Sequence, residues 1–401
     1  MELVGENMIT IRRAALGLVA VLALGGCTGG TDQAAGRGPA PIAADEEAPA
    51  PAVVTATPAM GSTGVGPAGP ISVSVADGRL ESVTLTNPAG KQVKGAMAAD
   101  GSSWTVTEPL GYGKTYTWAG SAVGEDGARV PIAGKFTTVT PKTTVRAQLN
   151  VGDDKTYGIA MPIKVTFTPP VTDRAAAERL LTVETSVPTE GGWAWLSDSA
   201  AHWRPKEYWK PHTEVTVTAA VYGHDLGGGA YGRDDVSASF TIGRSQIVKA
   251  DTQSHRMIVI RDGKKVHDFP ASYGLESDRR RVTRSGIHVV MSKHRTYEMN
   301  NPTFDYANVE VPFAVRIHNN GEFIHGYAPS IPSQGRENVS HGCINLSPAN
   351  AEIYFNSVLV GDPVEVVNSS VKLGEFDTDY SDYYDWTIPW PQWEAKSALA
   401  S

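Results

Sequence analysis

Cysteine is nearly absent from this chain, and the chain also lacks a positive charge excess and a long hydrophobic run. Only two of its 401 residues are cysteine, Cys27 and Cys343. The formal net charge is −8, so the composition shows no excess of basic residues of the kind that binds nucleic acid. The apolar run at residues 14–24 is shorter than the roughly 20 helical residues that span a bilayer. With 41% hydrophobic residues, this length predicts two or three folded domains with ample core.

The short apolar run reads as a signal-peptide core, because two arginines precede it. It ends in Leu-Gly-Gly-Cys at residues 24–27, which resembles a bacterial lipobox. The resemblance implies cleavage before Cys27 and lipidation of its thiol, which would anchor the chain to the outer face of the cytoplasmic membrane, facing the cell wall. An ordinary secreted protein cleaved nearby is the alternative. Translation can start at Met1 or at Met8.

Once Cys27 is assigned to a lipid, Cys343 stays unpaired in an oxidising compartment and becomes a candidate reactive thiol. It lies in Ser-His-Gly-Cys-Ile-Asn at residues 340–345, and a second histidine, His325, lies sixteen positions before His341. A free thiol is mostly protonated near neutrality, so it needs an imidazole and backbone N–H groups to react. A buried structural cysteine among core histidines is the alternative, and this order of residue types favours the nucleophile.

These motifs resemble the signature of the L,D-transpeptidase (YkuD-type) catalytic domain. The resemblance implies that Cys343 is the nucleophile, His325 the general base and acid, and His341 a support for the loop and the thiolate. On the residues alone, either histidine can be the base. Gly342 is expected to offer its backbone N–H to the oxyanion, together with that of Cys343. The positions expected to contact substrate are Met299, Tyr306, Asn320, Gly321, Ser340 and Asn345.

The same resemblance implies a reaction on peptidoglycan stem peptides. A tetrapeptide donor would lose D-alanine, form a thioester on Cys343 and pass its acyl group to a second stem, giving a 3→3 cross-link. Carbapenem β-lactams are expected to acylate the same thiol. An L,D-carboxypeptidase, an enzyme that attaches proteins to the wall, and a non-catalytic wall-binding lipoprotein are the alternatives. No cofactor or metal is expected, and the loop at residues 225–229 reads as a turn, because one aspartate among glycines is a poor calcium cage.

Strand-like alternation dominates the rest of the chain and predicts a mainly β protein. Residues 28–52 read as a flexible linker. Two immunoglobulin-like sandwiches follow at 53–142 and 143–244, resembling the domains that precede the catalytic domain in actinobacterial L,D-transpeptidases. The catalytic domain is expected at 245–370, and an aromatic-rich extension at 371–401 is expected to pack on it.

Within the catalytic domain the sequence predicts two hairpins, and the strand leaving the second one carries His325. Ser347 and a following proline predict a helix start, with a helix at 349–358 that turns Ile353, Tyr354 and Val358 toward a core. The three arginines at 279–281 read as a solvated loop rather than a binding patch.

Overall fold

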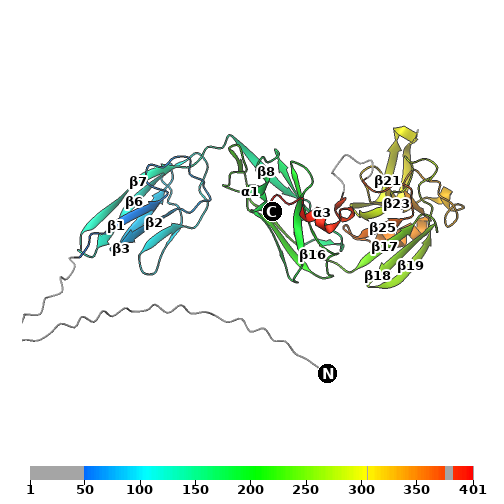
Figure 1. Cartoon of the computed structure of the whole chain (residues 1–401), viewed down its shortest axis with the longest axis horizontal. Coiled ribbons are helices and arrows are strands. Elements are labelled where there is room, and N and C mark those ends of the chain that lie inside the picture. Colours follow the sequence, from blue (N-terminus) through cyan, green and yellow to red (C-terminus); the bar gives the residue numbers. More distant parts are fainter. Residues whose placement is uncertain (1–48, 305, 375–382, 401) are drawn as a thin grey trace, which may run out of the picture. The chain divides into compact units, whose positions relative to one another are not determined.

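The computed structural model describes residues 49–304, 306–374 and 383–400 of the chain. The predicted signal peptide, Cys27 and most of the predicted linker therefore lie outside the described residues. In the described part, no helix has both the length and the apolar character that a membrane crossing requires. The described residues form three β-rich parts, which confirms the predicted mainly β fold (Figure 1).

The first immunoglobulin-like part is built from two small sheets with strand orders β1-β2-β5-β4 and β3-β6-β7. Its core contains Trp104 and Trp118, whose rings meet edge to face at 5.6 Å. Asp77 takes a positive φ of 54° in the turn between β2 and β3. The strands are β1 (Val53–Thr57), β2 (Ser72–Ala76), β3 (Gly78–Thr86), β4 (Gly95–Met97), β5 (Ser103–Val106), β6 (Thr115–Gly124) and β7 (Arg129–Thr137).

The second immunoglobulin-like part has sheets β12-β13-β10-β8-β15 and β11-β14-β16-β9. Alternating residues of β10 and β14 are buried, as expected for strands with one face on a core. Its elements are β8 (Thr143–Leu149), β9 (Thr156–Tyr157), β10 (Ile163–Thr168), α1 (Arg174–Glu178), β11 (Leu181–Thr185), β12 (Gly191–Trp195), β13 (Ala200–Pro205), β14 (Glu214–Ala219), β15 (Ala230–Gly232) and β16 (Val236–Ile242).

The third part, which corresponds to the predicted catalytic domain and is called the catalytic part below, also has two sheets, with strand orders β19-β18-β17-β25-β20 and β21-β22-β23-β24 (Figure 1). The first sheet contains the predicted hairpin, β18 and β19, and β25 pairs in parallel with β17. Its strands are β17 (Gln246–Asp251), β18 (Arg256–Arg261), β19 (Lys264–Pro270), β20 (Gly286–Val289), β21 (Ser292–Asn301), β22 (Tyr306–Arg316), β23 (Phe323–Gly326), β24 (Ile344–Leu346) and β25 (Pro363–Val367), with short 3-10 turns η1 (Pro302–Phe304) and η2 (Ala328–Ser330).

The helix after the catalytic loop, α2 (Pro348–Ser357), begins as the sequence predicts. The Ser347 hydroxyl accepts a hydrogen bond from the Asn350 N–H, and proline occupies the first turn. Tyr354 and Val358 are buried, but the prediction for Ile353 is wrong, because its side chain is 44% exposed. The buried helix face instead uses Ala351, Tyr354 and Phe355. Adjacent residues point about 100° apart on a helix, so Ile353 faces away from this stripe.

The C-terminal extension packs largely on the second immunoglobulin-like part, so the prediction that it packs on the catalytic domain is wrong for its aromatic end. In α3 (Trp390–Glu394), the Trp393 ring is fully buried and its Nε1–H donates to the Gly192 carbonyl at 2.9 Å. The Arg204 guanidinium lies 4.7–5.2 Å from the ring centroids of Trp386, Trp390 and Trp393. The three indole rings therefore make cation–π contacts with Arg204, which lies far from them in the sequence. The start of the extension contacts the catalytic part: the Leu373 N–H donates to the Ser285 carbonyl at 2.8 Å, the Tyr384 ring lies 5.8 Å from that of His318, and η3 (Asp385–Thr387) packs against β20.

Candidate active site

The two strands β23 and β24 bring the predicted nucleophile and base together. They pair in parallel with Ile324 opposite Ile344 and His325 opposite Asn345. Side chains of a strand alternate between faces, so Cys343, directly before β24, shares a face with Asn345 and with His325 across the ladder. Both Cys343 and His325 line one cavity of about 250 Å³, called the thiol cavity below. The pairing of β23 with β24 thus brings together two motifs that lie apart in the sequence.

The His325 side chain is held by its own strand end. It is 4% exposed, and its Nδ1 lies 3.0 Å from the Gly326 carbonyl oxygen. Since a carbonyl only accepts, Nδ1 carries the proton and Nε2 keeps a lone pair. Burial lowers the pKa of His325 to about 4. The imidazole is therefore neutral at physiological pH and available as a proton acceptor.

The Cys343 thiol is likewise neutral in the resting structure. Burial raises its pKa to about 12, and the backbone N–H of Phe323 opposes this rise. The Sγ–H donates to the Gly321 carbonyl oxygen at 3.4 Å. The site at rest is consequently a thiol beside a neutral imidazole rather than a thiolate-imidazolium pair, and attack requires transfer of the thiol proton.

Short hydrogen bonds fix the loop that carries the thiol. The Ser340 hydroxyl donates to the Cys343 carbonyl at 2.6 Å, so Ser340 holds the loop. The fully buried Thr283 hydroxyl donates to the Gly342 carbonyl at 2.8 Å and accepts from the Gly274 N–H at 2.9 Å. Gly342 has φ of +119°, a conformation that favours glycine.

The oxyanion role predicted for the Gly342 N–H disagrees with this geometry. That N–H donates to the Ser340 hydroxyl at 3.2 Å, so it is occupied by the loop. The residue type at Gly342 is explained by its positive φ instead. An oxyanion donor from this loop is therefore expected from Cys343 rather than from Gly342.

His341 lies at the rim of the site. It is exposed and its ring centroid lies 4.9 Å from that of Phe304. Partial burial and the nearby Arg281 guanidinium lower its pKa, so it brings no positive charge to the thiol at neutral pH. This disagrees with the electrostatic support predicted for His341. Arg281 donates to the Val339 and Ser340 carbonyls, so one of the three arginines read as a solvated loop holds the catalytic loop.

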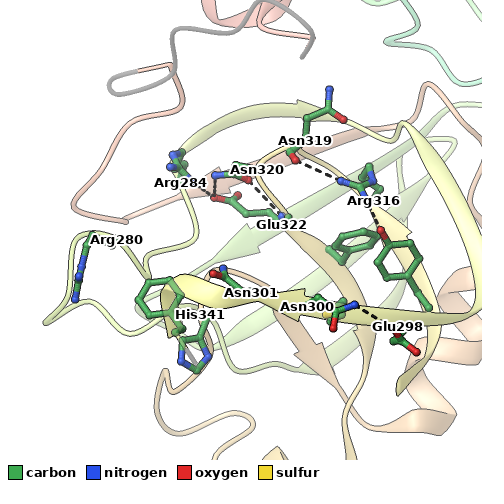
Figure 2. Close-up of a pocket in the computed structure, with 15 residues that line it drawn as sticks. Arg280, Arg284, Glu298, Asn300, Asn301, Arg316, Asn319, Asn320, Glu322 and His341 are labelled. Carbon is green, nitrogen blue, oxygen red and sulfur yellow. Dashed lines mark hydrogen bonds and ion pairs between the residues drawn. The ribbon is translucent and has the colours of Figure 1, made fainter. Parts of the chain in front are cut away.

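The predicted substrate positions divide between two hollows. Met299, Ser340 and Asn345 line the thiol cavity, and the buried Asn345 Oδ1 has no hydrogen-bond partner among the described residues. Asn320 and Gly321 line a second hollow of about 290 Å³, called the arginine pocket, together with Met299 and His341 (Figure 2). Tyr306 begins β22, but its side chain lies outside what the structure describes.

Three residues around the thiol are not singled out by any sequence motif, namely Thr283, Arg284 and Glu322. Arg284 forms an ion pair with Glu322, which is 2% exposed. The only sequence signal is Glu322 itself, an acidic residue directly before the apolar run that leads to His325. A carboxylate buried in this way requires a partner, but the sequence does not say which cation supplies it.

Among the residues described, no three or more His, Cys, Asp or Glu side chains gather as a cation site. In the loop at 225–229, the Asp225 Oδ1 accepts from the Gly227 N–H at 2.8 Å, which is a local turn contact.

Comparisons with known proteins agree with these features. Residues 62–225 match a bacterial Ig domain, and residues 245–366 match an L,D-transpeptidase catalytic domain. L,D-transpeptidase 5 of Mycobacterium tuberculosis (strain ATCC 25618 / H37Rv) is 50% identical over 359 residues, which cover 88% of this chain and 79% of that protein. L,D-transpeptidase 2 of the CDC 1551 / Oshkosh strain is 36% identical over 378 residues, 91% of each chain. A solved L,D-transpeptidase in complex with imipenem is 36% identical, with a TM-score of 0.48, over 57% of this chain and 100% of that chain. The chain therefore belongs to the L,D-transpeptidase family.

Proposed function

We propose that this chain forms 3→3 cross-links between peptidoglycan stem peptides through a thioester on Cys343. The observation that carries the proposal is the pairing of β23 with β24, because it puts the His325 imidazole and the Cys343 thiol on one cavity. Anchored at Nδ1, His325 offers Nε2 as its basic atom. A nucleophile beside an oriented base is the arrangement that acyl transfer requires.

In the first half-reaction, His325 Nε2 takes the proton of Cys343 as the sulfur attacks the amide carbonyl between diaminopimelate and D-alanine. The carbonyl oxygen becomes an oxyanion, for which the Cys343 N–H is the proposed donor. The carbon–nitrogen bond then breaks, and the imidazolium returns its proton to the D-alanine amine. The products are free D-alanine and an acyl thioester.

In the second half-reaction, an amine of a second stem attacks the thioester carbonyl. His325 takes a proton from this amine and delivers it to the departing sulfur, so the thiol and the neutral imidazole are restored. The new amide is the cross-link. The free Asn345 Oδ1 supports this proposal, because a buried acceptor without a partner suits a substrate N–H.

The choice of acceptor is tested by product analysis. Incubation with disaccharide-tetrapeptide is expected to give cross-linked dimers and free D-alanine, detected by liquid chromatography and mass spectrometry. The Cys343→Ser variant is the matched control and should give neither product. Release of D-alanine with only tripeptide monomers would identify a carboxypeptidase and contradict the proposed acceptor.

We further propose that the mature chain is tethered to the outer face of the membrane through lipid on Cys27. The support is the lipobox-like Leu-Gly-Gly-Cys at residues 24–27. Cys27→Ala should move the protein from the membrane fraction to the soluble fraction. A Cys27→Ala protein that remains wholly membrane-bound would refute the anchor.

A further inference from the structure

A buried ion pair lies directly beside the nucleophile. The Arg284 guanidinium pairs with the Glu322 carboxylate, whose side chain is only 3% exposed. Asn320 adds to this contact, because its Nδ2 lies 3.4 Å from Glu322 Oε1 and its Oδ1 accepts from the Glu322 N–H at 3.3 Å. Figure 2 shows Arg284, Asn320 and Glu322 together on one side of the arginine pocket. Burial of an unpaired carboxylate is costly, so the pair fixes where Glu322 lies.

The residues on either side of Glu322 contact the reactive sulfur. The Gly321 carbonyl accepts the Sγ–H of Cys343 at 3.4 Å, and the backbone N–H of Phe323 lowers the pKa of the same thiol. Glu322 also packs against the catalytic loop, since a Cβ at Gly342 would lie 3.4 Å from its Cγ. A side chain that anchors residue 322 therefore fixes both backbone groups that bracket the thiol.

We propose that Arg284 and Glu322 form a positioning pair that holds residues 321–323 against the sulfur of Cys343. Neither side chain is a catalytic residue, because both act through the backbone around the thiol. The inference rests on the proposed function of Cys343 as the nucleophile. It adds a second role for the pair: the Arg284 charge weakens the effect of the Glu322 anion on the thiol.

The charges around the sulfur determine whether the loss of each member of the pair raises or lowers the reactivity of the Cys343 thiol. Burial is the main cause of the raised pKa of Cys343; the Glu322 carboxylate raises it further, and Arg316 opposes that contribution. His288 faces Glu322 with Nδ1 at 4.0 Å from Oε2, and burial lowers its pKa, so it is neutral near pH 7. Among the described residues, the charged groups that pair with Glu322 or act on the thiol include Arg284 and Arg316.

Two substitutions should therefore shift thiol reactivity in opposite directions. Glu322→Gln keeps the shape and removes the anion, so alkylation of Cys343 at neutral pH should rise about three- to tenfold. Arg284→Met leaves the Glu322 anion uncompensated, so alkylation should fall by a similar factor, about three- to tenfold. Arg284→Lys should restore the wild-type rate in part. A role limited to fold stability would move both variants the same way.

The experiment uses the full chain with Cys27→Ser, so that Cys343 is the only thiol, and follows iodoacetamide adducts by mass spectrometry from neutral to alkaline pH. Arg244→Met is the matched control, because it removes another buried ion pair, the one that Arg244 makes with Asp362 of the catalytic part at 2.7 Å. It should leave alkylation unchanged. Opposite shifts of the alkylation rate in Glu322→Gln and Arg284→Met support the proposal, and any other pattern overturns it. If Arg284→Met does not fold, the alkylation rate of Glu322→Gln decides alone: a rise supports the proposal and no rise overturns it. Alkylation needs no stem peptide, so failure of the proposed cross-linking would be seen separately.

Discussion

Thr283 is expected to support catalysis through the loop that carries the thiol. Its buried hydroxyl bridges the Gly274 N–H at 2.9 Å and the Gly342 carbonyl at 2.8 Å. Thr283→Val preserves the shape and leaves both buried groups without partners. At about 1–3 kcal/mol for each of the two unsatisfied groups, the loss of stability should be about 2–6 kcal/mol. Because Gly342 precedes the proposed nucleophile, a shift of its carbonyl should also lower the rate of carbapenem acylation about ten- to hundredfold.

The assay measures acylation by mass spectrometry and urea unfolding for each variant. Thr138→Val is the matched control, because the Thr138 hydroxyl makes the same kind of bridge in the first immunoglobulin-like part, between the Lys114 N–H at 2.9 Å and the Gly111 carbonyl at 2.7 Å. It should lose stability and keep its acylation rate. Thr283→Ser keeps the hydroxyl and should stay close to wild type. Equal acylation rates for Thr283→Val and Thr138→Val would refute the reasoning.

Three further results are expected. His325→Ala should acylate at least about a hundredfold more slowly, the usual scale for a lost general base, and His341→Ala should lose less; the opposite ranking, by stopped-flow acylation, would exchange their roles. Since burial lowers the pKa of His325 from 6.5 to about 4, unfolding takes up a proton between these values. The stability gained from neutral His325 is present above pH 6.5 and should be lost as the pH falls toward 4, by about 3 kcal/mol, in urea titrations compared with His325→Gln. Extensive chelation should leave transpeptidation unchanged; a loss that calcium or zinc restores would contradict the metal-free mechanism.

Local sequence patterns predicted most of the β framework, because alternation, turn residues and helix caps act over a few residues. The turn at Asp77, the hairpin of β18 and β19, and the Ser347 cap all follow from such short-range chemistry. The position of His325 at the end of its strand was predicted in the same way. The short strand β24 could not be predicted from hydrophobic periodicity, because its three residues are all buried and show no alternation.

Long-range contacts were the part that the sequence hid. The extension was expected on the catalytic part, and its indoles instead surround Arg204, nearly two hundred residues earlier. The same holds for Arg284 and Glu322, whose pairing depends on how two distant segments meet beside the thiol. At Gly342, the residue type suggested an open backbone donor, whereas the Ser340 hydroxyl occupies that donor. The residue types indicated the chemistry of the site, whereas the hydrogen-bond and ion-pair partners of each residue became known only from the fold.

The most direct test of the account is intact-protein mass spectrometry after incubation with a tetrapeptide stem or a carbapenem, followed by peptide mapping. One covalent adduct is expected, on Cys343, with release of D-alanine when the stem is used. The Cys343→Ala variant should fold, because the side chain is a small buried group, and should form no adduct. An adduct on another residue, or cross-linking by Cys343→Ala within about tenfold of wild type, would contradict the nucleophilic role of Cys343.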